Sequence, residues 1–134
     1  MGVFNRNIVD DTYNETDVAL PNGAATTYST VIDLGDIDAT AENYELEVSV
    51  PALAVGIQAN GETLTANVVA GATTTPTAVI LGSIIVMTGA DGAGSAAASA
   101  RVRLPSTCAR YIRVQFVNTL GDKSTIDATV GLRF

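Results

Sequence analysis

Four arginines and a tyrosine near the end of the sequence are the residues best suited to binding another molecule. They are Arg101, Arg103, Arg110, Tyr111 and Arg113. A planar guanidinium can bind a carboxylate through two hydrogen bonds, and arginine and tyrosine are both enriched at protein interfaces. We therefore predict a protein contact in which these side chains meet carboxylates of a neighbouring copy or of another protein. The alternative is a solvated sheet face whose edge charges discourage aggregation.

Two groups of acidic residues are candidates for binding a cation or for acid–base chemistry. "DLGDID" places Asp33, Asp36 and Asp38 close together, but without the alternating ligands and distal glutamate of an EF-hand. A solvated acidic turn is therefore the preferred interpretation, and ion binding stays open. Glu45 and Glu47 are a pair of the kind that hydrolyses glycosides. Such pairs normally lie in clefts lined by aromatic rings, which are scarce here, so a solvated strand face is preferred.

The other reactive residue types argue against catalysis. The sequence contains no histidine, which removes Cys–His and Ser–His–Asp mechanisms and the commonest metal ligand. Cys108 is the only cysteine, so it cannot form an intrachain disulfide, and we expect a small buried hydrophobe. The glycines of "GADGAGS" lack the following Lys-Ser/Thr of a phosphate-binding loop and predict only a loop. We predict that the protein is not an enzyme and uses no cofactor or metal.

Charge is distributed unevenly along the 134 residues, whose net charge is −7. Through Glu62 there are eleven acidic residues and one basic residue, whereas from Arg101 onward there are six basic residues and two acidic ones. An acidic protein attracts nucleic-acid phosphates poorly, so no nucleic-acid partner is expected. Ends of opposite charge do suit contacts between neighbouring copies or with another protein.

Secretion and membrane insertion are not suggested by any segment. The first seventeen residues are polar and acidic, unlike a signal peptide, and the longest apolar stretch, "AVILGSIIVM", has about ten residues. "MGVFNR" lacks the Ser or Thr of a myristoylation motif. We expect a soluble protein made in the cytoplasm, with no membrane partner.

Stretches of alternating apolar and polar residues must supply the elements that carry these side chains. This period of two is typical of half-buried β-strands. It recurs in "YELEVSV", "ETLTANVV", "ARVRLP", "RYIRVQFV" and "STIDATVGLRF". The side chains predicted to face the core are those of Tyr44, Leu46, Val48, Val50, Leu64, Ala66, Val68, Val102, Leu104, Ile112, Val114, Phe116, Ile126, Ala128, Val130 and Leu132.

Three further stretches are less regular. The Asn60–Gly61 pair favours a tight turn, which predicts a hairpin from Ala54–Ile57 into Thr63. "TAVILGSIIVM" is either one buried strand or two short strands broken at Gly82. "TGADGAGSAAASA", residues 88–100, consists mostly of very small residues and predicts a loop with a possible strand at its end.

The spacing of these elements predicts the fold class. About eight strand candidates, separated by Gly, Pro, Asn and Asp, indicate an all-β protein, an antiparallel β-sandwich or jelly roll. We expect residues 26–134 to form a single jelly-roll domain. Residues 1–25 have weak periodicity, so they are expected to form an N-terminal arm or an irregular first segment.

Three stretches carry a resemblance to a known family. They are "TTYSTVIDLGD", "LPSTCARYIRVQF" and "STIDATVGLRF". Together they resemble the capsid cement (decoration) proteins of short-tailed bacteriophages, in the same order, over residues 26–134. The resemblance implies a jelly-roll protein of the virion, on the capsid exterior of the head. It also implies a structural role without chemistry.

The partners that the resemblance implies are the major capsid protein, whose subunits the protein would bridge, and further copies of itself, as a dimer or trimer. The family pattern identifies no binding residue that can be transferred, so the predicted interface depends on the arginine argument alone. The alternative function is a small β-sandwich binding module, such as a carbohydrate-binding domain or a phage fibre or tail domain.

Overall fold

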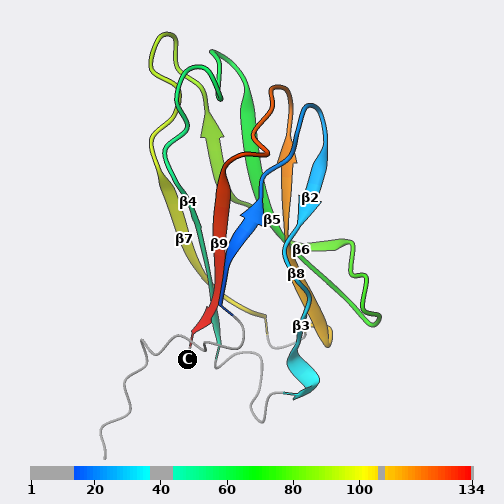
Figure 1. The fold of residues 1–134 in the computed structure, drawn as a ribbon. Helices are drawn as coiled ribbons and strands as arrows, with labels where there is room; N and C mark the ends of the chain where they lie inside the picture. Colours follow the sequence, from blue (N-terminus) through cyan, green and yellow to red (C-terminus); the bar gives the residue numbers. More distant parts are fainter. Residues whose placement is uncertain (1–13, 37–43, 106–107, 134) are drawn as a thin grey trace, which may run out of the picture.

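Strands in which burial alternates make up both sheets of the fold. The computed structural model describes residues 14–36, 44–105 and 108–133, which form two antiparallel sheets packed face to face (Figure 1). In the four-stranded sheet, Leu46 lies opposite Leu132 on one side and Val102 on the other. The strands of this sheet follow in the order β1 (Glu15–Ala19), β9 (Asp127–Arg133), β4 (Glu45–Val50) and β7 (Ala98–Arg103).

The second sheet is centred on β8, which has partners on both sides. β5 pairs with the whole length of β8 on one side. On the other side, β2 and β3 pair with successive parts of β8. The strands are, in order, β2 (Thr26–Tyr28) together with β3 (Ile32–Asp33), β8 (Tyr111–Asn118), β5 (Thr63–Gly71) and β6 (Ala78–Thr88). A three-residue 3₁₀ helix, η2 (Leu34–Asp36), follows β3. Within the described ranges, no helix has the length and apolar character needed to cross a membrane.

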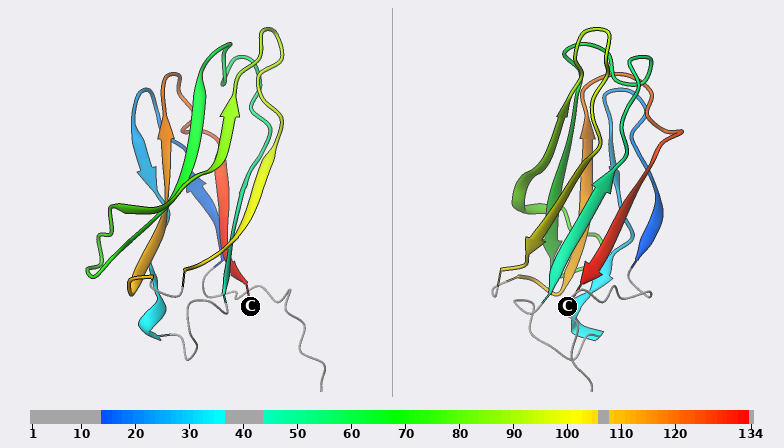
Figure 2. Two further views of the ribbon diagram at one scale, coloured as in Figure 1. Left: turned by 180° about the vertical axis from the view of Figure 1, so that it is seen from behind. Right: turned by 90° about the vertical axis from the view of Figure 1, so that its left-hand side faces the viewer.

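The strand order is that of a jelly roll in which one strand is interrupted. With β2 and β3 counted as one strand, every connection passes from one sheet to the other except the β5–β6 hairpin (Figure 2). Ser29 keeps the interrupted strand attached to β8. Its N–H donates to the Val114 carbonyl at 2.9 Å, and its hydroxyl accepts from the Val114 N–H at 2.8 Å. The predicted all-β sandwich or jelly roll of about eight strands is confirmed.

The core lies between the sheets and is built almost wholly from aliphatic side chains. Of the side chains predicted to face inward, all are buried except those of Val102 and Ile126, which are half-buried. Phe116 is the largest fully buried side chain, and its strand has hydrogen-bonded neighbours on both sides. The period-two pattern therefore predicted correctly which face of each strand packs against the other sheet.

The hairpin predicted from Ala54–Ile57 into Thr63 is wrong. Residues 55–57 form a turn, in which the N–H groups of Ile57 and Gln58 both donate to the Ala54 carbonyl. Gly61 does adopt the left-handed conformation of a tight turn, with φ +81°. The turn connects strands of different sheets, however, because β4 and β5 lie on opposite sides of the core.

The apolar stretch around Gly82 forms one strand, and that strand is not wholly buried. β6 runs from Ala78 to Thr88 at the edge of the five-stranded sheet, and its register with β5 is irregular near Ser83, where φ is +52°. Because an edge strand has a neighbour on one side only, several of its apolar side chains remain exposed. The strand predicted at the end of residues 88–100 is confirmed, since β7 begins at Ala98.

The first 25 residues, expected to form an arm or an irregular segment, are described from Asn14 onward. Glu15–Ala19 form β1, which pairs with β9 at the edge of the four-stranded sheet, and Leu20 is buried in the core. This part of the segment therefore belongs to the sandwich. Residues 1–13 of this segment lie outside the described residues.

Replacing Phe116 with alanine tests the proposed packing. We expect Phe116→Ala to lower the free energy of unfolding by about 3–5 kcal/mol, because it removes a fully buried ring and leaves a cavity between the sheets. Urea denaturation measures the loss. Val55→Ala is the control, since Val55 is 48% exposed in a turn, and a change within about 0.5 kcal/mol is expected there. Equal losses in the two variants would contradict this account of the core.

Candidate functional site

The outer face of the four-stranded sheet carries a group of paired charges, which we call the charge ladder. Glu45 and Glu47 of the central strand β4 lie between Arg101 and Arg103 on β7 and Arg133 on β9. Arg101 contacts both glutamates, at 3.3 Å from Nε to Glu45 Oε2 and 3.4 Å from Nη2 to Glu47 Oε2. Arg103 Nη2 lies 3.9 Å from Glu45 Oε1, and Arg133 Nη2 donates to Glu47 Oε1 at 3.0 Å.

The charge ladder changes the interpretation of Arg101 and Arg103. The sequence predicted contacts with carboxylates of another molecule, whereas the structure pairs both arginines with glutamates of the same chain. The arginine side chains remain 39% and 68% exposed, respectively. Exposed ion pairs contribute only about 0–1 kcal/mol to stability. These guanidinium groups can therefore exchange an internal carboxylate for an external one at little cost to the fold.

Arg110, another of the predicted interface residues, forms an ion pair with Asp33 through two hydrogen bonds. Its Nε and Nη2 donate to the two carboxylate oxygens of Asp33 at 2.8 and 2.9 Å. The pair is reinforced by the backbone, because Leu34 N–H donates to the Arg110 carbonyl and Gly35 N–H to Asp33 Oδ1. A Cβ atom on Gly35 would lie only 2.5 Å from Arg110 Nε. The sequence "DLG" therefore supplies both the carboxylate and the space that Arg110 needs.

The aspartate cluster is only partly described. Asp33 is bound to Arg110, and Asp36 ends the short helix η2. Asp38 lies outside the described residues. In the part of the chain that the structure describes, no group of three or more acidic, histidine or cysteine side chains is placed to hold a metal ion.

Tyr111 and Arg113 lie on β8, in the other sheet from Arg101 and Arg103. Arg113 Nε donates to the Pro76 carbonyl at 2.9 Å, and its guanidinium lies 3.7 Å above the centre of the Tyr28 ring. The Arg110 guanidinium lies 5.1 Å from the centre of the Tyr111 ring. The structure therefore places two of the five predicted interface residues on the four-stranded sheet and the other three on or directly before β8 of the five-stranded sheet.

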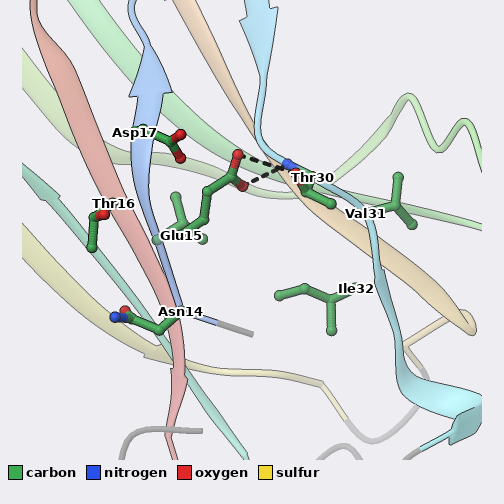
Figure 3. A pocket seen from close by; sticks show the side chains of 8 residues that line it. Asn14, Glu15, Thr16, Asp17, Thr30, Val31 and Ile32 are labelled. Atoms are coloured by element: carbon green, nitrogen blue, oxygen red, sulfur yellow. Dashed lines mark hydrogen bonds between the residues drawn. The ribbon is translucent and has the colours of Figure 1, made fainter. Parts of the chain in front are cut away.

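A pocket of about 370 Å³ opens between the edges of the two sheets (Figure 3). Residues before and within β1 line one wall, and Thr30, Val31 and Ile32 line the other. Glu15 reaches across, and its carboxylate accepts from the Thr30 N–H at 2.8 Å and from the Thr30 hydroxyl at 3.0 Å. Because both carboxylate oxygens accept hydrogen bonds from Thr30, Glu15 joins the two edges.

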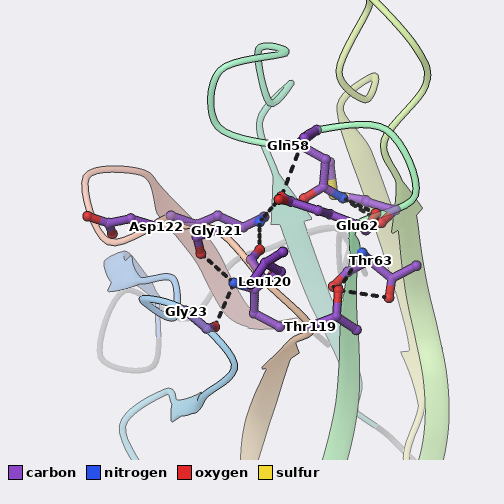
Figure 4. Close-up of polar contacts among 12 residues, drawn as sticks. Gly23, Gln58, Glu62, Thr63, Thr119, Leu120, Gly121 and Asp122 are labelled. Atoms are coloured by element: carbon purple, nitrogen blue, oxygen red, sulfur yellow. Dashed lines mark hydrogen bonds and ion pairs between the residues drawn. The ribbon is translucent and has the colours of Figure 1, made fainter.

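A buried polar network lies at the opposite end of the sandwich (Figure 4). Lys123 is fully buried, and its Nζ lies 3.2 Å from Glu62 Oε2 and donates to the Leu120 carbonyl at 2.7 Å. Gln58 Nε2 donates to the Met87 carbonyl, and Asn118 Nδ2 donates to two further carbonyls. The network joins the β1–β2, β4–β5 and β8–β9 connections.

The turn beside this network holds an aspartate with a lowered pKa. The hydroxyl of Ser124 donates to Asp122 Oδ1 at 2.6 Å, and the Ser124 N–H donates to the same oxygen at 2.9 Å. These two hydrogen bonds stabilise the carboxylate and lower the pKa of Asp122. The same hydrogen bonds fix the local turn that contains Lys123.

The sequence contains a signal for part of this arrangement. Glu45 and Glu47 are two residues apart on one strand face, as are Arg101 and Arg103. Matching pairs of opposite charge at this spacing are typical of neighbouring strands. Arg133, the third cation of the ladder, could be placed only once β9 was known to flank β4. The Lys123–Glu62 pair has no such signal, because it joins two loops.

Cys108 packs against the edge of the core, close to the position expected of it. Its side chain is half-buried and touches the hydrophobic cluster, so the expected full burial is only partly met. Removal from water disfavours the thiolate, which raises the pKa of Cys108. A raised pKa is the opposite of what a nucleophilic cysteine needs.

Removing Lys123 tests the buried network. We expect Lys123→Met to cost up to about 3–5 kcal/mol in the free energy of unfolding, because Glu62, whose side chain is only 13% exposed, then keeps its charge without its cation. Adding Glu62→Gln removes that charge, so the double variant should be more stable than Lys123→Met. Urea denaturation of the two single variants and the double variant measures this coupling. Additive losses would show that the two side chains do not interact.

The reactivity of Cys108 tests its environment. Alkylation by iodoacetamide requires the thiolate, so at pH 8 the folded protein should react at least about fivefold more slowly than the same chain in urea. The rate in the folded protein should continue to rise above the ordinary cysteine pKa of about 8.5, because burial raises the pKa of this thiol. Equal rates with and without urea would contradict the burial of this thiol.

Comparisons with known proteins identify no family. No family model matches the sequence, and no curated protein matches it. A chain from the structure of infectious bursal disease virus strain Gt is 16% identical, with a TM-score of 0.41, over 96% of this chain and 32% of that one. For strain Gx the identity is 16% and the TM-score 0.38, over 95% and 29%.

The third similar structure is the carbohydrate-binding module CBM36 in complex with calcium and xylotriose. It is 11% identical, with a TM-score of 0.35, over 96% of this chain and 92% of that one. The chain spans about a third of the length of the viral chains. At these identities and TM-scores, the similarities assign no function.

Proposed function

We propose that the protein is a capsid cement protein, which binds the outer surface of a bacteriophage head and bridges subunits of the major capsid protein. The supporting observation is that two of the three stretches resembling this family form neighbouring strands. "TTYSTVIDLGD" forms β2, β3 and η2, and "RYIRVQF" forms most of β8, which pairs with both strands. The Asp33–Arg110 pair joins the two stretches. Two motifs that are far apart in the sequence thus form neighbouring strands of one sheet.

The charge ladder is the contact surface that we propose for the capsid. It lies on the outer face of a sheet, so its side chains are held by a rigid backbone. Arg101 and Arg103 can turn from Glu45 and Glu47 towards carboxylates of the capsid with little loss of stability. Each such contact is modest. Many copies on a repeating surface, and several subunits bridged by each copy, would make the combined attachment strong.

A binding assay with empty heads tests this proposal. Heads stripped of the protein should bind the purified wild type at saturable sites and then resist heat better. Arg101→Gln/Arg103→Gln should bind at least about tenfold more weakly, because charge-assisted hydrogen bonds are lost. Glu45→Gln/Glu47→Gln is the matched variant. It should bind at least as tightly as wild type, since the arginines no longer have glutamate partners on β4.

The outcomes separate the function from the surface. Absence of wild-type binding to stripped heads would contradict the cement function itself. Normal binding by Arg101→Gln/Arg103→Gln would retain that function and exclude the charge ladder as the contact. Binding to a glycan array, dependent on added calcium, would instead support the alternative of a carbohydrate-binding module.

A further inference from the structure

β6 is a long edge strand without a charged residue. Its eleven residues pair with β5 alone in the part of the chain that the structure describes. Between Glu62 and Arg101 the sequence contains a single charged residue, Asp91, which lies beyond the end of this strand. The outer side of β6 therefore presents backbone hydrogen-bonding groups next to uncharged side chains. An edge of this kind is a template for pairing with another strand.

The other sheet edges have the features that normally prevent such pairing. β1 carries Glu15 and Asp17, and its register with β9 is irregular. β7 carries Arg101 and Arg103. β2 and β3 are only three and two residues long. Charged, irregular and short edge strands all resist the addition of a further strand. Among the described strands, β6 is the one edge that is both long and uncharged.

The second half of β6 is the part suited to pairing. Its register with β5 is regular from Ile85 to Thr88, whereas the irregularity around Ser83 separates it from the first half. Ile85 and Met87 face the core, and Val86, opposite Thr65, faces outward. Val86 is 56% exposed, although it belongs to a strand of the sandwich. An added strand here would cover an apolar side chain that the single copy leaves in water.

We propose that this edge pairs in antiparallel fashion with the same edge of a second copy, with the two-fold axis at Val86. The two five-stranded sheets then form one continuous sheet. Around this axis, Val86 faces its counterpart, Ile85 faces Met87 and Ile84 faces Thr88. Residues opposite each other in an antiparallel pair lie on the same face. The inward-facing residues of both copies therefore remain on the core side.

The uncharged edge of β6 is a place where two acidic copies can meet. Each chain carries a net charge of −7, so two copies repel each other over most approaches. Contact through β6 places no charged side chain opposite another, because none lies in the strand. The contact is short, with five residues from each copy, and an interface of this size is expected to be weak, in the micromolar range. This inference does not depend on the proposed capsid binding.

Sedimentation equilibrium of the full chain tests the proposed dimer. Wild type should dimerise with a dissociation constant of about 1–100 μM. Val86→Lys and Val86→Glu should each weaken dimerisation at least about tenfold, because like charges then face each other at the axis. An equal mixture of the two variants should form dimers again, since Lys then faces Glu. Val55→Lys, which adds the same charge at another exposed valine, should dimerise like wild type.

The two single variants separate edge pairing from general repulsion. Val86→Lys reduces the negative charge of the chain and Val86→Glu increases it, so general repulsion would shift their dimerisation in opposite directions. Edge pairing requires that both become weaker. A monomeric wild type at about 500 μM, a trimer, normal dimerisation of Val86→Lys, or no recovery in the mixture would each overturn the proposal. Circular dichroism of both variants confirms that they are folded.

Discussion

The whole structure depends on aliphatic packing between the inner faces of two sheets. Phe116 is the bulkiest contribution, and the remaining core consists mainly of valine, leucine, isoleucine and alanine from alternate strand positions. Because every second residue must face this core, every charged residue of a central strand must face outward. The charge ladder on β4, β7 and β9 is a direct result of this constraint. The outward-facing charges and the core are specified by the same alternation.

Local pattern was sufficient to predict the strands and their buried faces, as β4, β8 and β9 demonstrate. It could not predict which strands are neighbours, because sheet order is decided by contacts far apart in sequence. The failed hairpin after Ala54 and the exposed side of β6 both follow from this. Prediction of the candidate site from the sequence was limited in the same way. The arginines could be placed on strand faces, but Glu45, Glu47 and Asp33 became their partners only through the register of the sheets.

The two proposed contacts use different parts of one molecule. The charge ladder lies on the outer face of the four-stranded sheet, whereas the β6 edge belongs to the five-stranded sheet. A dimer paired through β6 would therefore keep two charge ladders exposed, one on each chain. Such a dimer could contact two sites on a repeating surface at once. Two weak interfaces would then reinforce each other without sharing residues.

The position of β9 limits when the fold can form. β9 lies between β1 and β4, so the four-stranded sheet has no continuous hydrogen bonding until residues 127–133 are present. During synthesis the first strands leave the ribosome long before this one. Until β9 is made, β1 lacks its hydrogen-bonded neighbour, because the pairing of Glu15 with Val130 spans over a hundred residues. Folding of this jelly roll is thus completed only after nearly the whole domain has been translated.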